Sequence, residues 1–167
     1  MSANLFRIAV TCIICRTDPD GKREYLILKR SPKERHGSEM WTVAGGIIEA
    51  KDWKEIPSDY TFPLWYDVGI KAVKREVLEE TGLTIINPKY LCDCIFIHKS
   101  NIPEIVLSYY ATNFKGEIKL SEEHTEYAWV SVDDLDKYNL LVDIPMEIRT
   151  VDKTIMYEME RVIYRCG

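Results

Sequence analysis

Four charged residues in one short segment have the types and spacing that suit metal-dependent chemistry. Glu76, Glu79 and Glu80 stand at i, i+3 and i+4, and Arg75 comes directly before them. On a helix this spacing places three carboxylates on one face, beside the apolar stripe. Carboxylates held close together repel one another unless a cation joins them, and Mg²⁺ prefers oxygen ligands of this kind. The segment therefore predicts either a magnesium site or an acidic, solvated helix face.

A pair of glycines upstream favours the metal site. Residues 41–43 are predicted to form a short strand, and Gly45 and Gly46 follow at its end, with Glu49 close behind. Glycine permits a tight turn and a close approach of the backbone to a ligand. A backbone carbonyl at this place is therefore a candidate for a further oxygen ligand of the metal.

The elements that must position these residues follow from hydrophobic periodicity. A helix is predicted over residues 68–81, with Asp67 as its N-cap and Gly82 as its C-terminal stop. Strands are predicted at 6–15, 25–29, 41–43, 91–98, 105–112 and 127–130, and further helices at 132–138 and from 144 onward. The irregular order of strands and helices predicts an α/β (α+β) fold with a mixed β-sheet, in a single domain over residues 1–167.

Composition narrows the class of protein. The chain has 167 residues, of which 46% are hydrophobic and 29% are charged, as is typical of a globular protein. The formal net charge of −5 argues against a general nucleic-acid binder, which usually has a basic face. Since no apolar run is long enough to span a membrane, no membrane partner is expected and a cytoplasmic location is the default expectation.

The five cysteines include a C-x-x-C pair, Cys12 and Cys15, that raises the question of a zinc or redox site. The pair lies inside the apolar run from Ile8 to Cys15, which is predicted to be a buried strand. Residues three apart on a strand point to opposite faces, and no second cysteine pair with zinc-finger spacing is present. We therefore interpret both as reduced, structural thiols.

Taken together, the glycine pair and the acidic helix resemble the Nudix signature, G-x5-E-x7-R-E-U-x-E-E-x-G-U, in which U is aliphatic. Residues 75–83 match the second half at every defined position, and the first half begins at Gly46. Trp41, Gly45 and Glu49 also stand where the family often has these residue types. The resemblance implies a Nudix-like α/β/α sandwich with a mixed sheet.

One departure from the signature concerns its first glutamate. Six residues after Gly46 stands Asp52, and eight residues before Arg75 stands Asp67, so the family's short spacer is lengthened by an insertion at about 51–66. Either aspartate is a candidate for the place of the missing glutamate. We interpret Asp67 as a helix cap and leave the role of Asp52 open.

The resemblance also implies an activity. Nudix hydrolases cleave the diphosphate linkage of a nucleoside triphosphate or a related nucleoside diphosphate-X substrate with Mg²⁺, or with Mn²⁺ as an alternative. The implied metal ligands are Gly45, Glu76, Glu79 and Glu80, and Arg75 is implied to give structural support. The implied general base is Glu76, Glu79 or a glutamate of the later loop, where Glu123 is preferred over Glu122 and Glu126. Arg30 is implied to bind a substrate phosphate.

Several alternatives stay open at this stage. The chain could instead be an inactive Nudix-fold module that binds or senses a nucleotide, although the presence of both Glu79 and Glu80 favours the enzyme. The expected partner is a small nucleotide-like molecule and not a nucleic acid, and a homodimer is left open. The aromatic residues of the insertion are interpreted as packing or dimer contacts before base stacking: Trp53, Tyr60, Phe62, Trp65 and Tyr66.

Overall fold

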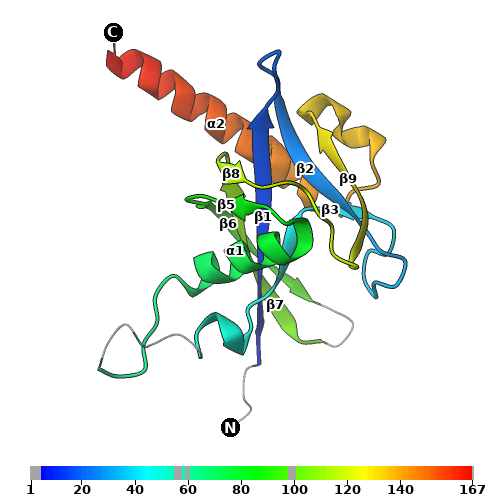
Figure 1. Ribbon diagram of the computed structural model, residues 1–167, viewed down its shortest axis with the longest axis vertical. Coiled ribbons are helices and arrows are strands. Elements are labelled where there is room, and N and C mark those ends of the chain that lie inside the picture. The colour runs from blue at the N-terminus through cyan, green and yellow to red at the C-terminus, as the bar shows by residue number, and fades with distance from the viewer. Residues whose placement is uncertain (1–4, 55–57, 59–60, 98–100, 167) are drawn as a thin grey trace. The chain divides into compact units, whose positions relative to one another are not determined.

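A computed structural model describes residues 5–54, 58, 61–97 and 101–166 of the chain, with side chains described up to residue 159 (Figure 1). It divides into two compact units, each built from separate stretches of sequence. The first unit comprises residues 1–12 and 44–121, and the second comprises residues 13–43 and 122–167. Strand β1 (Arg7–Thr17) runs through both, so each unit takes its strand pairings from one half of it.

The first unit holds the acidic helix. The first half of β1 pairs antiparallel with β4 (Ala44–Ile47), and β6 (Lys89–Ile97) pairs antiparallel with β7 (Pro103–Ala111). A hydrogen bond of 3.0 Å from Thr11 Oγ1 to Ser108 Oγ joins β1 to β7. A small sheet of β5 (Thr84–Ile85) and β8 (Phe114–Lys115), the short helix η1 (Ala50–Asp52) and α1 (Val68–Thr81) complete the unit.

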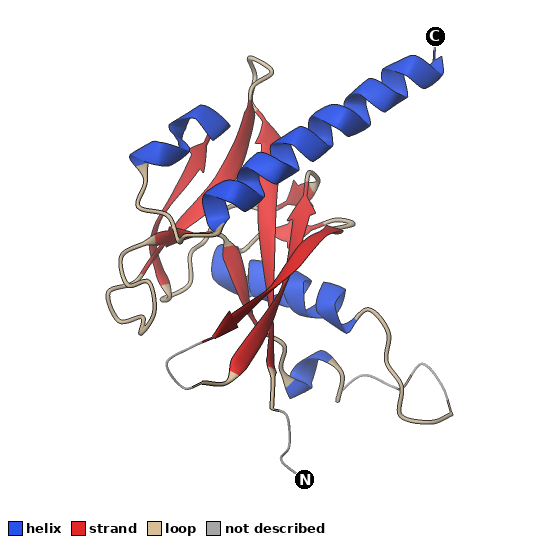
Figure 2. Ribbon diagram, turned by 180° about the vertical axis from the view of Figure 1, so that it is seen from behind, coloured by secondary structure: helices blue, strands red, loops and turns tan. Residues whose placement is uncertain are grey.

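The second unit is built around β2 (Arg23–Arg30). This strand pairs antiparallel with the second half of β1, with β3 (Trp41–Thr42) and with β9 (His124–Val130). Its helices are the short η2 (Val132–Lys137) and the long α2 (Ile144–Cys166), which Figure 2 shows as blue coils among the red strands. The core of this unit is made of fully buried side chains from β1, β2 and the two helices: Ile13, Ile14, Tyr25, Leu26, Ile27, Leu28, Leu135 and Ile148.

The acidic helix has the bounds that its apolar stripe predicts, 68–81, and ends at Gly82 with φ at 72°. Val73 and Val77 are buried on its inner face. The expectation that Asp67 caps the helix is wrong in its mechanism. Asp67 does occupy the N-cap position, but its backbone is left-handed (φ 56°), and its side chain makes no cap hydrogen bond. A capping side chain usually requires an extended N-cap backbone, which this conformation does not provide.

The predicted strands are all present, with bounds that differ by three residues or fewer, although His98 lies outside the described residues. The main difference is at Gly45 and Gly46. They were expected at a strand end, but they lie within β4, opposite Thr11 and Val10 of β1. Glycine disfavours strands in isolation, so this pairing depends on the close approach of β1, which the sequence does not reveal.

The C-x-x-C pair lies in β1, as predicted. Cys12 and Cys15 are both buried and both are free thiols. Burial raises the pKa of Cys15 to about 11 and raises the pKa of Cys12 as well, so neither thiol is poised as a nucleophile at neutral pH. Within the described part of the chain, no helix has the length and apolar character needed to cross a bilayer.

Candidate active site

The carboxylates of α1 differ in how far they reach into solvent. The Glu79 side chain is 49% exposed, whereas that of Glu76 is 12% exposed. Glu80 is buried, which corrects the expectation that all three stand beside the apolar stripe. Glu80 follows Val77 by three positions and Val73 by seven, so it belongs to the inner face of the helix. The helix therefore presents one solvent-exposed carboxylate, that of Glu79, keeps Glu76 mostly covered and holds Glu80 against the sheet.

Arg75 gathers oxygen atoms from three separate segments. Its Nη1 donates to Glu76 Oε1 at 2.7 Å and to Glu79 Oε2 at 3.0 Å. Its Nε and Nη2 donate to the two oxygens of Asp52 at 2.7 and 3.0 Å, and Nη2 also donates to the backbone carbonyl of Ile47 at 3.1 Å. This planar fork fixes the guanidinium, and through it the two glutamates, relative to β4 and η1.

Asp52 is the acidic partner that the sequence left undecided. Its side chain is 2% exposed and accepts both hydrogen bonds of the Arg75 fork. It also accepts the backbone N–H of Glu49 at 2.7 Å, which closes a capping box at the start of η1. Asp67 makes no such contact with Arg75. The structure therefore brings Asp52 into the carboxylate cluster, and its spacing of six residues after Gly46 is the sequence signal that pointed to it.

The two glycines are held for different reasons. The Gly45 N–H donates to Glu80 Oε2 at 2.9 Å, and a Cβ at Gly45 would lie 2.3 Å from the carbonyl oxygen of Val10. A Cβ at Gly46 would lie 2.6 Å from the carboxylate of Glu76. Gly45 thus allows the close strand pairing and orients Glu80, while Gly46 leaves room for Glu76. Both glycines shape the carboxylate cluster, while the expected role of the Gly45 carbonyl as a metal ligand stays a prediction.

Lys51 is a member of the cluster that sequence reasoning missed. Its Nζ lies 3.1 Å from Glu49 Oε2 and 3.2 Å from Glu79 Oε1. Lys51 stands one residue before Asp52, so the contact of Asp52 with Arg75 brings it beside α1. Nothing in its local sequence identified it, because Glu79 is 28 residues away along the chain.

Electrostatics in the cluster follow from burial and from the two cations. Burial raises the pKa of Glu76, and the hydrogen bond from Arg75 only partly offsets this. Burial also raises the pKa of Asp52, but the hydrogen bonds from Arg75 and from the Glu49 backbone outweigh it, so the net pKa is lowered. The hydrogen bond to Asp52 raises the pKa of Arg75 further above its already high value. Asp52 and Arg75 therefore both carry their charge at neutral pH.

The donor set fits a hard divalent cation in its chemistry. All the candidate ligands are oxygen atoms, and the carboxylate of Glu79 reaches solvent. In the conformation described, the carboxylates point to different partners: Glu80 to Gly45, Glu76 to Arg75, and Glu79 to Arg75 and Lys51. Among the residues with described side chains, no three acidic, histidine or cysteine groups converge as a ready-made metal site.

Comparison with known proteins decides the family. The NUDIX domain model matches residues 5–148, which is most of the chain. The chain belongs to the Nudix hydrolase family. It is accordingly a pyrophosphohydrolase, a hydrolase that acts on acid anhydrides, and the prediction of an enzyme is confirmed.

Individual relatives agree with this placement. The nucleoside triphosphatase NudI of Escherichia coli is 29% identical over 128 residues, which make up 71% of this chain and 80% of NudI. A MutT protein from Methanosarcina mazei Go1 has a TM-score of 0.67 at 25% identity, covering 92% of this chain and 98% of that one. The NUDIX domain of Shewanella oneidensis NrtR, solved with ADP ribose, has a TM-score of 0.70 at 15% identity, covering 93% and 90%. The predicted fold, a mixed β-sheet flanked by helices, is confirmed.

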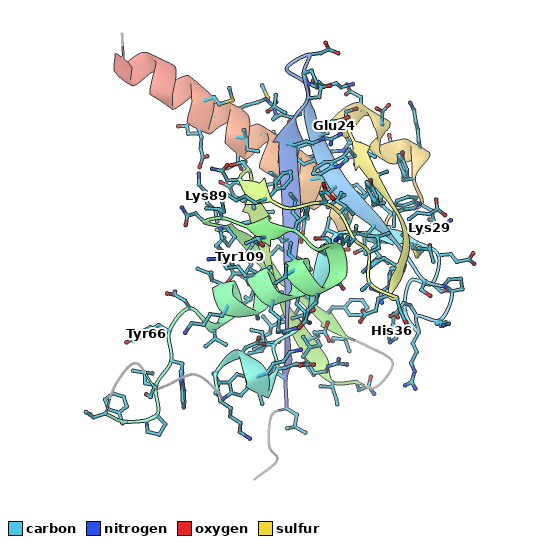
Figure 3. All side chains as sticks on the ribbon, in the orientation of Figure 1. Glu24, Lys29, His36, Tyr66, Lys89 and Tyr109 are labelled. Carbon is cyan, nitrogen blue, oxygen red and sulfur yellow. The ribbon has the colours of Figure 1, made fainter. Side chains whose placement is uncertain are left out.

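The remaining candidates of the Nudix hydrolase lie in the second unit. Arg30 donates from Nη2 to Glu34 Oε2 at 2.8 Å and from Nε to the carbonyl of His36 at 2.9 Å, in the loop that follows Lys29 and Arg30 (Figure 3 labels Lys29 and His36). Glu123 is exposed, and its backbone carbonyl accepts the N–H of Ser31 at 2.8 Å. The roles of Arg30 and Glu123 toward a substrate stay predictions.

The aromatic residues of the predicted insertion fall into two groups. Phe62 and Tyr66 are exposed at 57% and 55%, whereas Trp53 and Trp65 are half-buried. Trp53 lines an apolar cavity of about 600 Å³ in the first unit, together with Phe6, Ile48, Leu107 and others. Tyr60 lies outside the described residues. The position of Trp53 agrees with a packing role, while base stacking and dimerisation stay untested.

Proposed function

We propose that this Nudix hydrolase cleaves the diphosphate linkage of a nucleoside triphosphate or a related nucleoside diphosphate-X substrate, with Mg²⁺ or alternatively Mn²⁺. The observation that carries the proposal is the Arg75 fork, which ties two glutamates of α1 to a buried aspartate and to β4. Folding alone gives no reason to gather so many carboxylates around one arginine. A divalent cation and a polyphosphate give that reason.

In this proposal Glu76, Glu79 and Glu80, with the Gly45 carbonyl, hold the metal. When bound, the metal neutralises phosphate charge and lowers the pKa of the attacking water. Arg75 is a positioning residue, because it fixes Glu76 and Glu79 without needing to contact substrate. Phosphoryl chemistry depends mainly on positioning and charge stabilisation, so a rigid frame of this kind contributes directly to rate.

The proton acceptor for the attacking water is proposed among Glu76, Glu79 and Glu123. The raised pKa of Glu76 favours it, because a carboxylate with a higher pKa is a better base near neutral pH. Glu123 remains the candidate from the later loop. A Glu123→Gln variant separates the two, since a loss of activity together with loss of the acidic limb of the pH–rate profile would assign the role to Glu123.

The substrate class rests on the relatives and on charge. NudI carries the name of a nucleoside triphosphatase, and the NrtR domain was solved with ADP ribose, so nucleotides with a diphosphate group are the substrates to test first. The net charge of −5 is unfavourable for nucleic-acid binding.

We propose further that both units act together as one catalytic domain, since the family match runs through both. A homodimer is compatible with this proposal.

The test is an incubation of the purified protein with Mg²⁺ and a panel of nucleoside triphosphates, dinucleotides and nucleotide sugars, with products identified by mass spectrometry. We expect turnover by the wild type and a loss of about 10³-fold or more in a Glu79→Gln, Glu80→Gln double variant, since metal ligands carry the main electrostatic contribution. A Glu117→Gln, Asp133→Asn variant removes the same number of charges at exposed positions outside the box and should retain activity. Equal turnover by both double variants would overturn the proposed site.

A further inference from the structure

Lys51 occupies an oxygen of the one α1 carboxylate that reaches solvent. Its Nζ is 3.2 Å from Glu79 Oε1, while Arg75 takes the other oxygen, Oε2, at 3.0 Å. Both oxygens of Glu79 are thus bound by the protein's own cations. From this contact, and resting on the proposed role of Glu79, we propose that Lys51 is an exchangeable internal cation: it neutralises Glu79 in the metal-free enzyme and is released from Glu79 when the metal binds.

The charges around Glu79 explain why such a cation is useful. Among the described residues, four carboxylates, those of Glu49, Asp52, Glu76 and Glu79, pair with two basic side chains, Arg75 and Lys51. Without Lys51 the accessible end of the cluster would lack a balancing charge. Like charges held within a few ångströms raise the free energy of the folded state, and a lysine contact lowers it.

The two basic side chains differ in how firmly they are held. Arg75 is 16% exposed and is fixed by five hydrogen bonds, two of them to the buried Asp52. Lys51 is 42% exposed and reaches Glu79 from a long, flexible stem. Exposed ion pairs of this kind contribute little stability, so Lys51 leaves at small cost, whereas Arg75 does not. Only Lys51 has the geometry of a replaceable partner.

Glu49 provides the place to which Lys51 withdraws. Lys51 Nζ lies 3.1 Å from Glu49 Oε2, and the Glu49 side chain is more than half exposed. A divalent cation on Glu79 Oε1 attracts that oxygen more strongly than an ammonium does and repels the ammonium. Lys51 then keeps its pair with Glu49 and gives up its pair with Glu79, so no charge is left unpaired by the exchange.

The experiment measures metal binding and not turnover. Mn²⁺ is titrated into the metal-free, full-length protein, and free Mn²⁺ is followed by electron paramagnetic resonance. We expect a Lys51→Met variant to bind Mn²⁺ about two- to fivefold more tightly than the wild type, which is the range set by one exposed ion pair. Lys54→Met is the matched control. It removes the same charge three residues away, where the described part of the structure shows no ion pair, and we expect its affinity to change less.

A second measurement needs no variant. A crystal structure of the wild type with Mn²⁺ is expected to show Lys51 Nζ moved out of hydrogen-bond range of Glu79 Oε1 and still close to Glu49. Equal Mn²⁺ affinities for Lys51→Met and Lys54→Met, or an intact Lys51–Glu79 contact with Mn²⁺ bound, would overturn the exchange while leaving the proposed metal site in place. Absence of any Mn²⁺ binding by the wild type would instead refute the proposed metal site and the exchange with it.

Discussion

Each unit of this Nudix hydrolase contains an arginine that binds a partly or fully buried aspartate, and the two clusters are balanced differently. In the first unit, Arg75 contacts three carboxylates and a backbone carbonyl. In the second unit, Arg23 Nε donates to Asp152 Oδ1 at 2.7 Å, and the hydroxyl of the fully buried Tyr25 donates to the same oxygen at 2.7 Å. The second cluster has one cation for one anion, while the first has an excess of acid.

This difference in balance separates a cluster that serves chemistry from one that serves stability. The Arg23 cluster is complete in itself: the cation, the anion and the buried hydroxyl satisfy one another and fasten β2 to α2. The Arg75 cluster has more carboxylates than basic side chains, and this excess of negative charge does not stabilise the folded state. An unbalanced set of carboxylates around a rigid arginine is therefore the stronger indicator of a functional site.

The largest difference between the two clusters is expected when the aspartate of the first cluster is removed. In Asp52→Ala we expect kcat to fall by about 10²-fold, because Arg75 loses its anchor and the positions of Glu76 and Glu79 relax. The free energy of unfolding should fall by about 3 kcal/mol, since Arg75 loses the two charge-assisted hydrogen bonds that it makes to a buried carboxylate. Activity is measured well below the unfolding temperature, with chemical denaturation alongside.

Asp52→Glu serves as the control for this prediction. It keeps the carboxylate and lengthens its stem to that of the family's usual glutamate, so we expect it to recover most of the activity and of the Mn²⁺ affinity. If Asp52→Ala and Asp52→Glu were equally inactive and equally weak in Mn²⁺ binding, the positioning role of Asp52 would be wrong.

The corresponding change in the second cluster should affect stability alone. In Asp152→Ala both Arg23 and the Tyr25 hydroxyl lose their acceptor, and we expect the free energy of unfolding to fall by about 2 kcal/mol. At 25 °C, kcat/KM should stay within about twofold of the wild type, because none of the proposed ligands contacts this cluster. Tyr25→Phe removes only one donor and is expected to cost about 1 kcal/mol. A loss of activity in Asp152→Ala without a loss of stability would erase the distinction between the clusters.

The sequence predicts well those elements whose signal is local. Val73 and Val77 repeat at helical spacing and Gly82 ends the pattern, so the bounds of α1 follow from its own residues. The long apolar run of β1 and the shorter apolar run of β2 likewise require no knowledge of their partners. The second half of the Nudix box is contiguous, and its carboxylates therefore meet on one helix as soon as the helix is recognised.

The sequence fails where a contact joins distant segments. Asp52 and Arg75 are 23 residues apart. Their separation along the chain does not predict that both carboxylate oxygens of Asp52 accept hydrogen bonds from the Arg75 guanidinium. Lys51 depends on that same contact. The sequence places Gly45 and Gly46 after the end of a strand, whereas their pairing with β1 makes them part of β4. The absence of a side-chain cap at Asp67 arises from a left-handed backbone, which an aspartate permits but its residue type does not predict.

The two units also differ in the pH range in which protonation lowers the stability of the folded protein. In the second unit, burial and the nearby charge of Arg30 lower the pKa of His124 to about 4. The unfolded chain binds this proton near pH 6.5, so the unfolded state binds more protons than the folded state between these values, and stability falls as the pH drops through that window. In the first unit, the pKa of Asp52 is lowered, so its contribution is present above the ordinary aspartate pKa and is lost only at lower pH.

We therefore expect a His124→Leu variant to flatten the pH dependence of unfolding. Between pH 7 and pH 4.5 the wild type should lose about 2 kcal/mol more than the variant, as measured by chemical denaturation at each pH. Asp52→Asn should leave this difference unchanged and alter the slope of the profile only below about pH 4, where Asp52 of the unfolded chain takes up a proton before that of the folded protein does. The place of His124 in β9, where its Nδ1 is buried and has no hydrogen-bond partner among the described residues, indicates a neutral imidazole. Identical slopes for the wild type and His124→Leu above pH 4.5 would contradict this assignment.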